Sequence, residues 1–179
     1  MLNTEDSVLV LVDFQSRLAE IVERKELVVP NALRLIEGCR ALGVPILPTL
    51  QVPEKLGGMP PELEEALGEI PIIDKSVFSA LREPVFLLAL RQSGRNQVLL
   101  AGIEAHVCVL QTGLDLLDAG YQVHALSDGV FSRRMENQQV ALMRLHDAGA
   151  IISSVEIALF EMIRTSKHPQ FRTISGLIK

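Results

Sequence analysis

Short, continuous apolar runs alternate along this chain with segments in which apolar residues recur at helical spacing. The runs at 7–12, 44–50 and 98–101 are rich in valine, leucine and isoleucine, which is typical of strands covered on both faces. The segments at 29–42 and 109–118 carry the apolar stripe of an amphipathic helix, and a glycine follows each of them closely. Such an alternation predicts parallel strands that are joined by helical crossovers.

The rest of the chain continues this alternation and predicts a single domain over residues 1–179. The expected fold class is α/β, a three-layer α-β-α sandwich around a Rossmann-like, mainly parallel sheet of about six strands. The proline- and glycine-rich segment at 51–69 is the least regular part, and we expect a lid or an oligomer contact there. Further strands are predicted at 71–76, 121–126 and 150–153, further helices at 61–67, 84–91, 135–147 and 155–164, and a terminal helix or turn at 168–177.

Three chemically useful side chains each lie at or shortly past the end of a predicted strand. Asp13 follows the first strand, Lys75 ends the third, and Cys108 lies in the bend between the 98–101 strand and the next helix. In sheets of this kind, sites form beyond the carboxyl ends of the strands, where the strand order reverses. We place that reversal between the first strand and the 98–101 strand, because these begin the two halves of the chain. Asp13 and Cys108 are then expected to face each other across one crevice.

Each of these residues also has an ordinary structural explanation. A free cysteine is commonly a small buried hydrophobe, as we expect Cys39 to be, and a single aspartate after a strand often caps a turn. The three residues together suggest a catalytic site. A nucleophilic thiol needs a base such as Asp13 to take its proton, and a cation such as Lys75 stabilises the thiolate and the carboxylate. Cys108 is also expected in the first turn of a helix, where the macrodipole would lower its pKa.

The three residues lie in motifs of distinctive order. These are Leu11-Val-Asp-Phe-Gln15, Asp74-Lys-Ser-Val-Phe-Ser-Ala80 and Gly102-Ile-Glu-Ala-His-Val-Cys-Val109, and the pattern continues through 120–124 and 127–129. With these motifs the sequence resembles the isochorismatase-like cysteine hydrolase superfamily, which also contains nicotinamidases and N-carbamoylsarcosine amidases. Within it, the sequence looks most similar to the isochorismatase-domain-containing proteins, whose tail resembles His168-Pro-Gln-Phe171.

The resemblance implies a catalytic triad. Asp13 would be the general base, Lys75 the stabiliser, and Cys108 the nucleophile that forms a thioester-type covalent intermediate. It also implies a non-proline cis peptide between Ile103 and Glu104, with the backbone N–H groups of Glu104 and Cys108 forming the oxyanion hole.

The expected substrate pocket includes Phe14, Gln15, Phe78 and His106. Ordinary core packing explains the phenylalanines equally well, and a lone histidine is more often structural than functional. One departure from the family pattern stands close by, since family members commonly have threonine where Ala105 stands.

Two subgroups of the resembled superfamily fit the sequence less well. Nicotinamidases bind zinc through histidines after the second strand, but residues 48–54 contain none, and the four histidines of the chain show no metal-ligand spacing. True isochorismatases lack the cysteine, so Cys108 argues against their vinyl-ether hydrolysis. We therefore expect no metal and no cofactor.

Composition and charge argue against several classes of partner. The net charge is −5, aromatic residues make up 4%, and no basic run occurs, so we expect no nucleic acid. No apolar run is long enough to span a membrane, no signal peptide is apparent, and two cysteines suit a reducing compartment, so we expect a cytoplasmic protein. The first strand is not followed by Gly-x-Gly-x-x-Gly, which argues against a dinucleotide-binding domain.

The sequence therefore predicts a metal-independent cysteine hydrolase that acts on a small amide or related C–N bond, in a chain expected to form homo-oligomers. The alternative is a non-catalytic oligomeric interaction protein that keeps the hydrolase fold. The presence of all three candidate groups favours the enzyme. A redox role for Cys108 also stays open, although no resolving cysteine lies nearby in the sequence.

Overall fold

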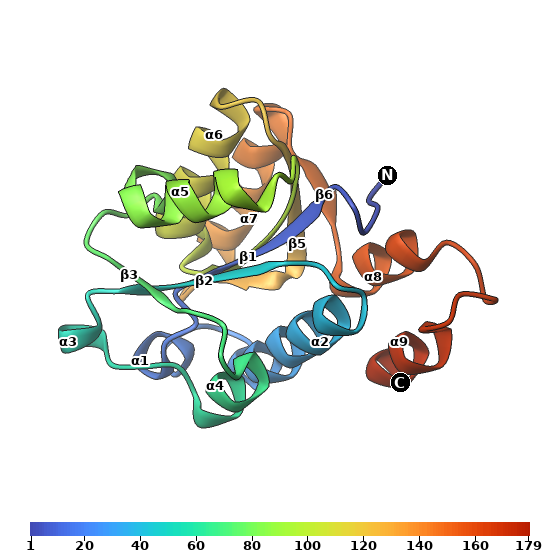
Figure 1. Cartoon of the computed structure of the whole chain (residues 1–179). Helices are drawn as coiled ribbons and strands as arrows, with labels where there is room; N and C mark the ends of the chain where they lie inside the picture. The colour runs from blue at the N-terminus through green and yellow to red at the C-terminus, as the bar shows by residue number, and fades with distance from the viewer.

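Every pair of neighbouring strands in the sheet is parallel, and the strand order is β3-β2-β1-β4-β5-β6. The computed structural model describes residues 1–179 and places this sheet between two layers of helices (Figure 1). The predicted α/β sandwich is thereby confirmed. The strands are β1 (Ser7–Val12), β2 (Ile46–Gln51), β3 (Ile73–Lys75), β4 (Gln97–Ile103), β5 (Gln122–Phe131) and β6 (Ile151–Ser153).

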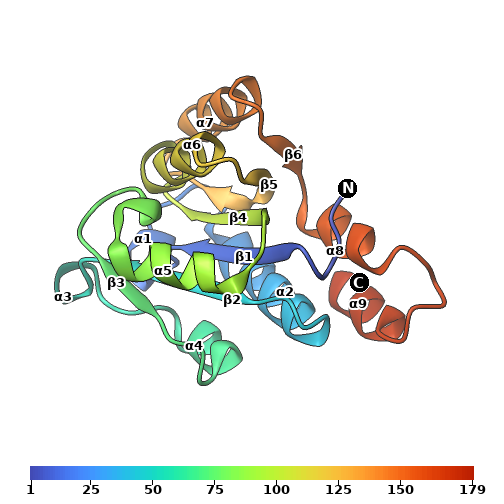
Figure 2. The same cartoon turned by 45° about the horizontal axis from the view of Figure 1, so that its top comes forward.

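The helices divide between the two faces of the sheet, as the two views show (Figure 2). One face is covered by α2 (Val28–Ala41), α4 (Pro61–Leu67), α8 (Val155–Ile163) and α9 (Phe171–Ile178), and the other by α5 (Pro84–Ser93), α6 (Leu110–Asp118) and α7 (Met135–Asp147). The short elements are α1 (Ser16–Ala19), α3 (Pro53–Leu56), the 3-10 turns η1 (Lys25–Leu27) and η2 (Ala80–Arg82), and the π-helical turn η3 (Ala105–Val109). No helix has the length and apolar character needed to cross a membrane.

The continuous apolar character of β1 follows from its place between two hydrophobic cores. Leu9 and Leu11 pack into the core under α2 and α8, while Val8, Val10 and Val12 pack into the core under α5, α6 and α7. Successive side chains of a strand point to opposite faces, so a strand with a core on each side needs apolar residues at every position.

The predicted helices 61–67 and 135–147 have these bounds in the structure, and Ser154 caps α8 by accepting a hydrogen bond from the Ile157 N–H at 3.2 Å. One expected boundary was wrong. β5 continues past Leu126 to Phe131, because its pairing with β4 shifts register at the Ser-Asp-Gly sequence instead of ending there. Cys108 lies in the π-helical turn η3, which runs directly into α6, so the thiol is near the N-terminal end of this helical segment.

The strand order reverses between the central strands β1 and β4, which pair along their length from Ser7–Gln97 to Val12–Gly102. This confirms the predicted neighbours. The two strands approach so closely at their carboxyl ends that a Cβ atom on Gly102 would lie 2.4 Å from the Val12 carbonyl oxygen. Only glycine fits at this position. The close approach brings the residues that follow each strand to one edge of the sheet.

Candidate active site

Asp13 is the first residue beyond β1 and its carboxylate is completely buried. Its backbone is left-handed, with φ at 55°, a conformation that aspartate tolerates better than most residues, and it turns the chain at the end of the strand. Both carboxylate oxygens have partners: Thr49 Oγ1 donates to Oδ1 at 2.8 Å, and Lys75 Nζ donates to Oδ2 at 2.7 Å. These bonds compensate for the removal of the charge from water.

Lys75 is the last residue of β3, and its side chain is also completely buried. Besides Asp13, its ammonium donates to Gln51 Oε1 at 2.6 Å and to the carbonyl oxygens of Val77 and Phe78 at 3.3 and 3.2 Å. A buried ion pair is tolerated when further hydrogen bonds satisfy both ions, and this condition holds here. The structure thus brings Asp13 and Lys75 together, as the sheet topology predicted.

Cys108 lies within the π-helical turn η3 and is 6% exposed. Burial, and after it the negative charge of Asp13, raise the pKa of its thiol to about 12, although the positive charge of Lys75 opposes the shift. The expected lowering of the pKa is therefore wrong, since desolvation outweighs the nearby cation. The unreacted thiol carries its proton at neutral pH, and any nucleophilic role requires a base to remove it.

The peptide bond between Ile103 and Glu104 is cis, as the family resemblance implied. The Glu104 carboxylate accepts hydrogen bonds from the Arg133 backbone N–H at 3.2 Å and from Arg133 Nε at 3.1 Å. His106 Nδ1 lies 3.0 Å from Ser132 Oγ. These contacts join the bend after β4 to the segment after β5. The Glu104 backbone N–H itself donates to no protein acceptor.

The four expected pocket residues differ in their exposure to solvent. Phe14 is completely buried in the core beneath α2, so ordinary packing explains it. Gln15 is also completely buried, and the backbone of neighbouring segments uses its amide. By contrast, Phe78 is 52% exposed and the His106 side chain is 22% exposed. Phe78 and His106 are therefore the two that reach the surface.

Two further residues of the candidate site were not predicted from the sequence. Thr49 and Gln51 are both buried in β2, and they contact Asp13 and Lys75 respectively. The signal available was the spacing, because polar residues two apart in a strand point to the same face. Alternation of this kind inside a buried strand indicates a polar site on that face.

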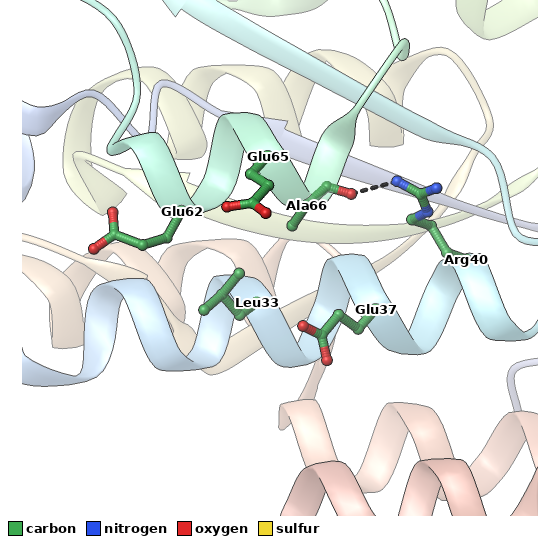
Figure 3. Close-up of a pocket in the computed structure, with 6 residues that line it drawn as sticks. All are labelled: Leu33, Glu37, Arg40, Glu62, Glu65 and Ala66. Carbon is green, nitrogen blue, oxygen red and sulfur yellow. Dashed lines mark hydrogen bonds between the residues drawn. The ribbon is translucent and has the colours of Figure 1, made fainter.

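A surface hollow between α2 and α4 lies apart from these groups (Figure 3). It contains no member of the buried site, and the one hydrogen bond between its residues joins Arg40 to the Ala66 carbonyl. No group of three or more histidine, cysteine or carboxylate side chains in the protein is placed to hold a metal ion. The lining residues are Leu33, Glu37, Arg40, Glu62, Glu65 and Ala66.

Comparison with known proteins agrees with this fold and these motifs. The family model of the isochorismatase domain matches residues 7–157. Isochorismatase domain-containing protein 2 of Danio rerio is 37% identical over 177 residues, which cover 99% of this chain and 89% of the relative. The secreted isochorismatase effector Isc1 of Phytophthora sojae is 39% identical over 177 residues, which cover 97% of this chain and 84% of the relative.

Solved structures show the same similarity. MAR1 ribonuclease from Caenorhabditis elegans has a TM-score of 0.93 and 36% identity, and the match covers 99% of this chain and 91% of that one. YcaC from Pseudomonas aeruginosa, solved with hexane-2,5-diol and covalent acrylamide, has a TM-score of 0.91 and 25% identity, covering 98% and 90%. The family that the motifs indicated is thus confirmed, and this chain belongs to the isochorismatase family.

Proposed function

We propose that this chain is a metal-independent cysteine hydrolase that attacks the carbon of a small amide or related C–N bond. The observation that supports the proposal most strongly is the buried ion pair between Asp13 and Lys75, whose charges both act on Cys108. A base, a cation and a nucleophile in one buried place are the parts that nucleophilic catalysis requires.

The first chemical step joins Cys108 Sγ to the carbonyl carbon of the substrate. The carbon–sulfur bond forms while the thiol proton moves to Asp13, and the electron pair of the carbonyl moves onto its oxygen. Because the Cys108 pKa is raised to about 12, the thiol keeps its proton until the substrate arrives, and proton transfer accompanies attack. Lys75 stabilises the negative charge that develops on the sulfur as the proton leaves it.

The second step expels the leaving group. Asp13 returns the proton to the substrate nitrogen, the C–N bond breaks, and the acyl group stays on Cys108 as a thioester. Water then attacks the thioester carbon while one of its protons moves to Asp13, and a carbon–oxygen bond forms. The carbon–sulfur bond breaks, Asp13 returns the proton to the sulfur, and the acid product leaves.

The developing oxyanion needs hydrogen-bond donors, and we assign this role to the backbone N–H groups of Glu104 and Cys108. The free N–H of Glu104 supports the assignment. The Glu104 side chain is held by Arg133 on the neighbouring segment, which limits movement of the donor. A fixed donor stabilises an oxyanion without reorganisation during the reaction.

We further propose that the chain forms homo-oligomers. Ile151 and Ile152 in the edge strand β6 are 47% and 37% exposed, and an unprotected apolar edge strand favours association. Size-exclusion chromatography with light scattering tests this proposal, and a monomer at micromolar concentration would contradict it.

The hydrolase proposal is tested by screening small amides and related C–N compounds for turnover. Activity should disappear in Cys108→Ala and persist in Cys39→Ala, because Cys39 is buried in the core away from the ion pair. RNA belongs in the same screen, since the C. elegans neighbour is described as a ribonuclease. The net charge of −5 leads us to expect no RNA cleavage. Turnover by Cys108→Ala would overturn the proposal.

A further inference from the structure

We infer that Gln51 is a positioning residue for Lys75 and that Gln15 holds Gln51 in place for this task. The inference rests on the proposed function, to which it adds two residues from outside the triad. Gln51 Oε1 accepts the shortest hydrogen bond that Lys75 makes, at 2.6 Å, and Gln51 is 8% exposed.

The contact with Gln51 determines how the three ammonium protons of Lys75 are shared among its acceptors. An ammonium group has three protons, and here it faces four acceptors. Asp13 Oδ2 at 2.7 Å and Gln51 Oε1 at 2.6 Å take two of the protons at short range. The carbonyls of Val77 and Phe78, at 3.3 and 3.2 Å, share the third. Only this weakly held proton is free to turn toward Cys108 Sγ when the sulfur becomes anionic.

The orientation of the Gln51 amide is set by its other end. Nε2 donates to the Ser76 carbonyl oxygen at 2.9 Å, so Oε1 must face Lys75. A carbonyl oxygen can only accept from an ammonium, which makes this arrangement the one that satisfies both groups. Gln51 thus engages one proton of Lys75 without adding a charge, and it holds the ammonium in the orientation in which its third proton can turn toward Cys108.

Gln15 supports Gln51 from the end of β1. Its Oε1 accepts from the Gln51 backbone N–H at 2.9 Å, and its Nε2 donates to the carbonyl oxygens of Gln51 at 3.1 Å and Gly57 at 2.6 Å. Gln15 is completely buried. One hydrogen-bonded chain therefore connects Lys75 through Gln51 and Gln15 to Gly57, in the irregular segment after β2. A positioning side chain is effective when it is itself locked in this way.

The rate of Cys108 alkylation by iodoacetamide, followed by mass spectrometry across a range of pH, tests the inference without a known substrate. Gln51→Met removes the acceptor while keeping the volume. Lys75 should then spend less time near Cys108, so its lowering of the thiol pKa weakens. Alkylation at a fixed alkaline pH should become about threefold to tenfold slower, and the whole profile should move to higher pH, since one pKa unit changes the thiolate fraction about tenfold.

The sign of the change separates positioning from a merely structural role. Loosening of the site would expose the thiol and accelerate alkylation, whereas loss of positioning slows it. Gln97→Met is the matched control, because Gln97 is 7% exposed and uses its amide at the opposite end of the sheet, on Met1 and Asn3. This control should leave the profile unchanged even if it lowers stability.

Gln51→Asn provides a second variant should Gln51→Met fail to fold, because it keeps the amide but withdraws it from Lys75. It should slow alkylation in the same direction. Faster alkylation or a wild-type profile in the folded variants would overturn the inference. Failure of the proposed function would appear separately, as a wild-type protein that turns over no C–N substrate although its alkylation profile responds to Gln51.

Discussion

Lys75 Nζ lies 2.7 Å from Asp13 Oδ2, and both side chains are completely buried. This ion pair joins the edge strand β3 to the end of the central strand β1, across β2. Its burial means that each charge depends on the other for most of its compensation.

Removal of the cation should destabilise the fold strongly. Lys75→Met leaves the Asp13 carboxylate buried without its cation, and we expect a loss of roughly 3–5 kcal/mol in the free energy of unfolding. Chemical denaturation measures this loss. Lys25→Met is the control, because Lys25 pairs with Glu20 at the surface, where side chains are 58% and 74% exposed and ion pairs contribute at most about 1 kcal/mol. Equal losses in the two variants would contradict the claim that the buried Asp13 carboxylate depends on Lys75.

The close approach of β1 and β4 makes a second prediction. In Gly102→Ala the new methyl group would meet the Val12 carbonyl oxygen at 2.4 Å, so the strands must separate. We expect a loss of at least about 2 kcal/mol in the free energy of unfolding, with slower formation of Cys108 adducts.

Gly176→Ala serves as the comparison, because nothing lies within 4 Å of the added Cβ and the position is helical. Helix propensity predicts a gain of up to about 1 kcal/mol there. Thermal unfolding of both variants measures the two stabilities. A Gly102→Ala protein as stable as the wild type would show that the close approach of β1 and β4 is not required.

A third prediction concerns His124, which is 1% exposed and has no hydrogen-bond partner at either ring nitrogen. Burial lowers its pKa, so the folded protein disfavours the protonated ring. Below the unfolded pKa of about 6.5 the unfolded chain binds a proton that the folded chain resists, and stability therefore falls as the pH drops. His124→Gln should reduce this fall in a series of thermal unfolding curves. His146→Gln, at a side chain 70% exposed, should not change it.

A fourth prediction concerns the thiol itself. Because the Cys108 pKa is raised to about 12, alkylation of the wild-type protein should keep rising well above the ordinary cysteine pKa of about 8.5. Iodoacetamide kinetics with quantification of the modified peptide measures this rise. An alkylation rate that stops rising at a pH below the ordinary cysteine pKa would show that Cys108 is a thiolate before substrate binds.

The sequence predicted the architecture well where the signals are local. Periodicity predicted the helices 61–67 and 135–147, and the position of Asp13 and Lys75 at the carboxyl ends of their strands predicted that they lie together. The short helices Ser16–Ala19 and Pro53–Leu56 contain too few residues to show a period.

The properties that depend on the assembled environment could not be predicted in this way. The pKa of Cys108 reflects its depth of burial, which no neighbouring sequence reports. The role of Gln51 depends on a lysine 24 positions further along the chain. Both depend on contacts that exist only after the strands align.

The most direct test of the central claim is peptide mapping of an acyl-enzyme trapped during turnover of an amide substrate. We predict that rapid acid quenching captures the acyl mass on Cys108, that Cys39 stays unmodified, and that Cys108→Ala forms no adduct and no product. An unmodified Cys108 throughout turnover, or product formation by Cys108→Ala, would contradict covalent catalysis by this thiol.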